Sequence, residues 1–147
     1  MFEELEIEVP KVIAGKTVRA VTVTHTIDAA GFIVEGDSGA LAYSGDTGPT
    51  DHFWEVLASV PRLKALLMEV SFPNQESGIA KVSGHHTPQS LAADLQKLAA
   101  LPGVQPDALP TLLFHMKPVF QKAVETECAR LAGLSLEVAQ LDDQFTF

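Results

Sequence analysis

The chain has 147 residues, with 10 Lys and Arg against 19 Asp and Glu, so its formal net charge is −9. This length suits a single hydrophobic core and argues against two independent domains. Because 46% of the residues are apolar and only 20% are charged, the composition excludes a disordered acidic tail. An acidic surface repels phosphate backbones, and the sequence contains no basic cluster to offset it, so we expect no nucleic-acid partner.

Cysteine content and the N-terminal residues bear on location. Cys128 is the only cysteine, which rules out an internal disulfide, and residues 1–6 lack the basic and apolar regions of a secretion signal. No apolar run approaches the roughly 20 residues that cross a bilayer. The sequence therefore predicts a cytoplasmic protein without a membrane partner.

The first third of the chain has the pattern of short antiparallel strands. The expected strands are residues 6–9, 17–24, 31–35 and 40–43. They are rich in β-branched or aromatic residues, and Gly, Asp and Ser separate them, as in strands joined by hairpins. Residues 36–39, Gly-Asp-Ser-Gly, are the clearest turn.

After Tyr43 the pattern changes to alternating helices and strands. Helices are expected at 52–57 with Thr50 or Asp51 as cap, from Thr87-Pro88 to just before Pro102, and at 119–131; strands are expected at 66–70, 111–114 and 134–138. Residues 102–110 are predicted to be a loop within one domain, 1–147. We expect an α/β sandwich whose late strands are covered on both faces.

Polar residues collect where the predicted strands end. His25, Asp46, Glu69 and His115 lie at or just after strand ends, and His85 precedes a predicted helix. Strand ends flanked by Gly or Pro are common places for a site in an open α/β sheet. These five residues are therefore the candidates for chemistry.

Each candidate also has a structural interpretation. A lone histidine is more often a hydrogen-bonded structural residue, and Asp46 in Ser-Gly-Asp-Thr-Gly would close a turn. Glu69 is harder to explain in this way, because a carboxylate inside an apolar strand needs a partner. His52 is interpreted as solvated and Cys128 as a small buried hydrophobe. Taken together, imidazoles and carboxylates from neighbouring strand ends suit Zn²⁺ or Mn²⁺, so a metal site is the leading hypothesis.

Five ordered motifs resemble one known family. They are THTIDAAGFI at 24–33, YSGDTGP at 43–49, EVSFPN at 69–74, SGHHTP at 83–88 and HMKP at 115–118. Together they resemble the metallo-β-lactamase superfamily, most closely its class II cyclic-nucleotide phosphodiesterases, which are related to the tRNA 3′-processing endonucleases. The resemblance extends from about residue 21 to 119. It implies an αββα sandwich and two metal ions, zinc with manganese or iron as alternatives, that activate water for phosphodiester hydrolysis.

The resemblance also implies individual roles. His25 would bind the first metal, Asp46 would bridge both metals and His115 would bind the second. His85 would be the catalytic histidine facing the phosphate, and Glu69 would orient it. Ser83, Thr87 and Asn74 would have support roles, and His86 competes with His85 for the catalytic position.

One expected motif is absent. The superfamily takes its other metal ligands from a His-x-His-x-Asp-His motif in the N-terminal half of the fold, and this sequence has none. The chain is therefore predicted to be roughly the C-terminal half of the sandwich, inactive alone, and completed by the missing half or by a homo-oligomer. Three interpretations stay open: a cyclic AMP phosphodiesterase, an RNase Z-like or other hydrolase of the superfamily, and a non-catalytic binding or oligomerisation module.

Overall fold

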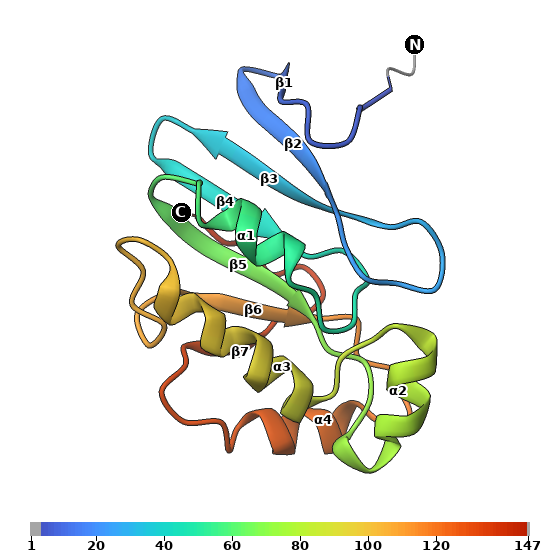
Figure 1. Ribbon diagram of the computed structural model, residues 1–147. Helices are drawn as coiled ribbons and strands as arrows, with labels where there is room; N and C mark the ends of the chain where they lie inside the picture. The colour runs from blue at the N-terminus through green and yellow to red at the C-terminus, as the bar shows by residue number, and fades with distance from the viewer. Residues whose placement is uncertain (1–3, 147) are drawn as a thin grey trace.

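The computed structural model describes residues 4–146, which form one seven-stranded sheet covered by helices (Figure 1). The strands follow the chain order across the sheet. They are β1 (Lys11–Ile13), β2 (Lys16–Thr22), β3 (Ala30–Gly36), β4 (Gly39–Tyr43), β5 (Leu63–Glu69), β6 (Thr111–Phe114) and β7 (Leu136–Val138). This architecture confirms the α/β fold class.

Strand direction determines where the functional side chains meet. Strands β1 to β4 pair antiparallel, whereas β4 to β7 pair parallel. Consequently β2 runs in the same direction as β4, β5 and β6, because two antiparallel steps separate it from β4. The carboxyl ends of all four strands therefore lie along the same edge of the sheet.

One face of the sheet is covered by two of the helices. The helices are α1 (His52–Leu57), α2 (Ser77–Ser83), α3 (Pro88–Leu95) and α4 (Gln121–Cys128), with 3₁₀ turns η1 (Asn74–Glu76) and η2 (Gln96–Ala100). Figure 1 shows α1 and α3 in front of the strands. A Cβ placed on Gly31 would lie 3.0 Å from the ring of Phe53, so β3 packs closely against α1. The core under these helices includes Ile33, Leu66, Met68, Leu91, Leu95 and Leu113, all fully buried.

The opposite face of the sheet carries a row of half-buried aromatic side chains. Phe32 alternates with the buried Ile33 along β3 and is paired with Tyr43 on β4. The rings of Phe32 and Tyr43 stack with centroids 6.4 Å apart, and those of Tyr43 and Phe114 are 5.0 Å apart. We call Phe32, Tyr43 and Phe114 the aromatic row. On β6 itself, Leu112 and Leu113 point to opposite faces and both are buried, as predicted for a strand covered on both sides.

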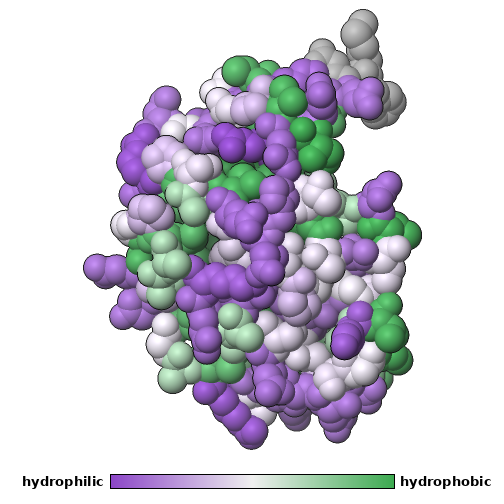
Figure 2. Space-filling view, in the orientation of Figure 1, coloured by the Kyte–Doolittle hydropathy of each residue, from purple (hydrophilic) through white to green (hydrophobic). Residues whose placement is uncertain are grey.

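The surface on the helix side is mixed in character. Figure 2 shows hydrophilic residues over much of this face and hydrophobic residues gathered near β1 and β2. The large apolar side chains exposed in that region are Ile7, Val9, Val12 and Ile13. No helix within residues 4–146 is long and apolar enough to cross a membrane.

The expected strand at residues 6–9 is wrong. Ile7 makes only an isolated bridge to Ala20, and the edge strand is formed instead by β1. The reason is the turn at Ala14 and Gly15, which have φ of 49° and 77°. Two residues at positive φ make a turn that matches the twist of a hairpin, so β1 folds back on β2.

Helix boundaries also differ from the predictions. The helix expected at 119–131 is reduced to α4, and the strand expected at 134–138 begins at Leu136. Asp51 occupies the cap position of α1, but its side chain makes no capping bond and pairs with Lys97 instead. Thr87 caps α3 as predicted, through a reciprocal pair of bonds with Ser90.

Candidate functional site

The site lies along the edge where β2, β4, β5 and β6 end. Glu69 is the last residue of β5 and His115 directly follows β6, while His25 and Asp46 each come three residues after β2 and β4. Because these strands run in one direction, their ends bring residues 90 positions apart in sequence to one edge. Four of the five predicted site residues are therefore delivered by strands.

The fifth, His85, is delivered by the loop between α2 and α3. Gly84 ends α2 with φ 69°, a left-handed conformation that suits glycine. A Cβ on Gly84 would lie 2.9 Å from the Cα of His25. The carbonyl oxygen of Gly84 lies 2.9 Å from Nδ1 of His25. Gly84 thus permits the close approach that places the rings of His25 and His85 only 4.9 Å apart, edge to face.

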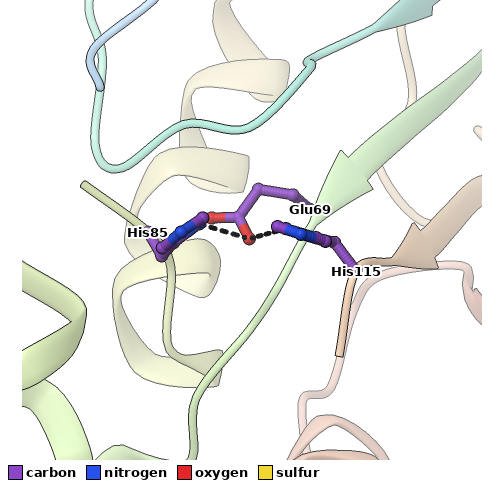
Figure 3. A group of neighbouring side chains, drawn as sticks. All are labelled: Glu69, His85 and His115. Carbon is purple, nitrogen blue, oxygen red and sulfur yellow. Dashed lines mark ion pairs between the residues drawn. The ribbon is translucent and has the colours of Figure 1, made fainter. Parts of the chain in front are cut away.

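Glu69 is the centre of the site, with no exposed surface. Its Oε1 accepts a hydrogen bond from the backbone amide of His86 at 2.5 Å. Its Oε2 lies 3.4 Å from Nδ1 of His85 and 3.8 Å from Nδ1 of His115 (Figure 3). A carboxylate in an apolar strand needed partners, and the site provides them.

The hydrogen bonds keep this buried carboxylate ionised. Burial alone would raise the pKa of Glu69. The imidazoles of His115 and His85, the Ser71 hydroxyl and the amide of His86 outweigh that effect and hold the pKa below its usual range. At neutral pH the site therefore contains a buried negative charge that faces two imidazoles.

Asp46 and His115 form a second, more accessible pair. Nδ1 of His115 lies 3.2 Å from Oδ1 of Asp46, and their side chains are 33% and 41% exposed. Asp46 also contributes, after burial, to raising the pKa of Tyr43. The backbone of His115 has φ 67°, which is costly for a residue with a side chain and is typical of a functional position.

The loop that carries Asp46 is fixed by backbone contacts. Gly45 has φ 62°, and a Cβ there would clash with the carbonyl oxygen of Ala30. The amide of Gly48 and the hydroxyl of Thr47 both donate to the carbonyl of Thr24, at 2.8 and 3.2 Å. The Asp46 loop is thereby tied to the segment that carries His25.

The composition of this cluster fits a metal ion. Within the described residues, Glu69, His85 and His115 form the one group of three ligand-type side chains whose donor atoms all lie within 4.8 Å of one another. Asp46 adjoins this group through His115, and His25 adjoins it through His85. Nδ1 of His25 is paired with the Gly84 carbonyl, the kind of partner that orients a histidine ligand and leaves Nε2 available.

The two neighbouring histidines have different environments. His85 faces Glu69 and His115, whose ring centroid is 5.2 Å away, whereas His86 is fully buried toward α3. Nδ1 of His86 lies 3.0 Å from Oγ of Ser90, and Nε2 lies 3.6 Å from Asp94. Burial lowers the pKa of His86. Only His85 presents its ring to the other site residues.

The three residues expected to support the site, Asn74, Ser83 and Thr87, make hydrogen bonds that hold helices and loops in place. Thr87 caps α3, and Oδ1 of Asn74 accepts a bond from the Gln89 amide at 2.8 Å, which joins the loop after β5 to that helix. The Ser83 hydroxyl donates to the carbonyl of Ile79 within α2.

Sequence reasoning missed Ser71, which is fully buried. Its hydroxyl donates to Oε2 of Glu69 at 2.7 Å and lies within 3.4 Å of both His85 and His115. The available signal was its position two residues after Glu69, inside the same motif.

Comparison with known proteins defines the class. Residues 3–116 match the family described as the beta-lactamase superfamily domain. The chain belongs to this family, and the solved structures that resemble it have the metallo-β-lactamase fold.

Three of those structures illustrate the likeness. The metallo-beta-lactamase fold protein YhfI from Bacillus subtilis has a TM-score of 0.72 and 14% identity, covering 92% of this chain and 52% of that one. Unliganded yeast PDE1 has a TM-score of 0.73 and 19% identity, with coverages of 92% and 47%. The short form of human tRNase Z has a TM-score of 0.61 and 19% identity, with coverages of 88% and 42%.

The chain thus spans about half the length of these structures. At these identities the likeness shows the fold alone. No curated protein matches the chain.

Proposed function

We propose that this chain supplies one half of a metal-dependent phosphodiesterase, with a 3′,5′-cyclic nucleotide such as cyclic AMP as substrate. The observation that supports this most is the convergence of Asp46, Glu69, His85 and His115 on one edge of the sheet. The motif resemblance to class II phosphodiesterases selects the substrate class, and yeast PDE1 is among the structures that match.

In this proposal His25, Asp46 and His115 hold metal, as zinc or alternatively manganese or iron. Imidazole and carboxylate donors suit these ions. Bound divalent ions would supply an activated water and charge neutralisation at the phosphate. Glu69 is given the role of orienting His85 in this proposal, because it is fully buried and its oxygens accept bonds from Ser71 and the His86 amide.

In this proposal His85 is a general acid and does not bind metal. Its side chain is 9% exposed, and its Nδ1 lies 3.4 Å from Oε2 of Glu69. An imidazolium at the substrate is a suitable general acid for a departing alkoxide. Glu69 keeps the ring oriented.

The proposal requires further ligands from outside this chain. Each ion of a zinc site needs about four donors, and three candidate residues cannot satisfy two ions. We infer that a half carrying the His-x-His-x-Asp-His motif, or a second copy of the chain, completes the sandwich. The aromatic row offers the half-buried apolar surface on which such a partner would pack.

A cavity beside His85 is large enough for a small substrate. Its volume is about 510 Å³, and it lies between the Gly48-Pro49 loop, α2 and the start of α3. Lys81 and His85 both line it. With a net charge of −9, the protein is better suited to a small anion, attracted locally, than to a long RNA.

The test is metal analysis and hydrolysis measured on the same preparations. The protein is purified under native conditions with any partner attached, and in parallel as this chain alone. We expect the assembled protein to contain zinc, manganese or iron and to hydrolyse cyclic AMP, while the isolated chain binds metal weakly and turns over little.

Other outcomes would select other interpretations. Cleavage of precursor tRNA without hydrolysis of cyclic AMP would support the RNase Z-like alternative. An assembled protein with neither metal nor turnover would support the non-catalytic module. Tight binding of two ions and full turnover by the isolated chain would overturn the half-fold argument.

A further inference from the structure

The Ser71 hydroxyl lies in the middle of the group that has the composition of a metal site. Its Oγ is 2.7 Å from Oε2 of Glu69, 3.4 Å from Nδ1 of His85 and 3.3 Å from Nδ1 of His115. It also lies 3.1 Å from the carbonyl oxygen of His115. All these neighbours surround a side chain with no exposed surface.

Hydrogen counting assigns a direction to each contact. A serine hydroxyl has one proton to donate and two lone pairs to accept. The 2.7 Å contact to the ionised Glu69 has the length of a charge-assisted O–H···O⁻ bond, so the proton goes there rather than to the carbonyl at 3.1 Å. The lone pairs of Oγ then face the two imidazoles.

Two lone pairs attract an imidazole nitrogen only if that nitrogen carries a proton. We propose that Ser71 is a positioning residue whose hydroxyl donates to Glu69 and accepts from Nδ1–H of His85 and His115, fixing the Nδ1–H tautomer of each ring in its neutral form. The surroundings agree, because the oxygens of Glu69 and Asp46 also face these nitrogens. A lone pair on either Nδ1 would be repelled by them.

This assignment changes the interpretation of the Glu69, His85 and His115 group. A serine hydroxyl already occupies the space between the three donor atoms, so the group is a hydrogen-bonded network. A metal ion would then be held beside this network, with Nε2 of His115 as the available ligand atom. The catalytic meaning of these tautomers rests on the proposed function, but the tautomers themselves do not. They are measurable without metal or substrate.

The experiment is a long-range ¹H–¹⁵N NMR spectrum of the metal-free chain, which distinguishes protonated from unprotonated ring nitrogens. It is recorded at about pH 8, above the ordinary histidine pKa. In the unaltered chain we expect His85 and His115 to be in the Nδ1–H tautomer. In Ser71→Ala we expect His85 to become a mixture of tautomers. His115 should change less, because Asp46 remains 3.2 Å from its Nδ1.

Two further variants distinguish loss of the Ser71 hydroxyl from a general disturbance of the buried structure. Ser71→Thr keeps the hydroxyl and should restore the tautomer of His85. Ser44→Ala is the matched control, since the Ser44 hydroxyl is equally buried and accepts from the amide of Glu69 at 3.1 Å but contacts no imidazole. It should leave both tautomers unchanged.

Several results would overturn the assignment. One is an Nε2–H tautomer of His85 in the unaltered chain. This result would contradict the proposed Nδ1–H assignment even if Ser71→Ala does not fold. Another is a Ser71→Ala spectrum identical to that of the unaltered chain, or the same change in Ser44→Ala. In the assembled protein, Ser71→Ala should lower kcat about 10- to 100-fold, the usual effect of removing an orienting partner. If the protein proves not to hydrolyse cyclic AMP, the NMR assignment of the tautomers is unaffected, because it needs neither metal nor substrate.

Discussion

Asp46 and His85 are neighbours of the same His115 but have different predicted tasks. Asp46 is exposed enough to contact an ion, whereas His85 is held against the buried Glu69. In the assembled protein we expect Asp46→Ala to lose metal and turnover together. We expect His85→Ala to keep its metal while turnover falls about 10²- to 10⁴-fold, the usual contribution of a general acid.

Metal content by elemental analysis and cyclic AMP turnover, measured on the same samples, check this prediction. His52→Ala is the control, because His52 is an exposed histidine that pairs only with Glu8 and Glu55 on the surface. Loss of metal in His85→Ala would show that His85 is a ligand and that the two roles are wrongly divided.

The sequence predicted the candidate residues, of which the structure brings Glu69, His85 and His115 together, but it could not predict the hydrogen bonds between them. Glu69 was predicted from chemistry, since a carboxylate in an apolar strand requires partners, and the structure supplies four of them. Ser71 gave no such signal, because a serine is ordinary at almost any position. Its importance comes from the separation of β5 and β6, which places His115 beside it 44 residues later. The choice between His85 and His86 likewise depended on which ring the α2–α3 loop turns toward Glu69.

Among the elements, the α2–α3 loop depends on a glycine at its first position, Gly84. Gly84 has φ 69° and touches His25, while Gly103 has φ 73° and open space within 4 Å of the position that a Cβ would occupy. Gly103→Ala therefore measures the backbone penalty alone, about 1–2 kcal/mol. Gly84→Ala adds a clash with the His25 backbone, so we expect a larger loss of unfolding free energy and a displaced His25 ring.

Chemical denaturation of both variants gives the two free energies, and NMR of the histidine rings reports the displacement. The Gly103 variant should leave the His25 signals unchanged. Equal destabilisation by the two substitutions, with His25 unmoved in both, would contradict the proposed close approach.

Element prediction succeeded where local pattern and tertiary environment agree. The apolar run at 66–70 and the Thr87-Pro88 start signal correspond to β5 and α3. Residues 77–83 gave no helical signal, because Ser77, Gly78 and Ser83 are weak helix formers and no apolar stripe repeats. Helix α2 forms there because Gly84 ends it and Ala80 packs against the core. The β1–β2 hairpin was missed because the turn at Ala14 was not recognised.

At the scale of the molecule, the two faces of the sheet are unequal. One is covered by α1 and α3 (Figure 1), and the other carries the half-buried aromatic row together with the buried Leu112. The absent His-x-His-x-Asp-His motif led us to expect one half of a sandwich, and this stays a prediction. The chain covers 52% and 47% of two of the solved structures that match. A partner that covered this face would be recognised through contacts outside this chain, so sequence patterns within the chain cannot specify it.

The half-buried aromatic row leads to a prediction about association. Contiguous apolar surface on one sheet face favours burial against another surface. Val34 lies two residues after Phe32 on β3 and so on the same face of the sheet. We expect the isolated chain to self-associate with increasing concentration, and Phe32→Lys or Val34→Lys to shift it toward the monomer by placing a charge on that face. Val12→Lys is the matched control, since Val12 is 73% exposed on the edge strand β1 and away from the aromatic row. Sedimentation velocity measures the association and circular dichroism verifies that each variant is folded. A chain that stays monomeric at every concentration, or a Val12→Lys variant that dissociates as readily, would show that the aromatic row is not the surface through which this chain self-associates.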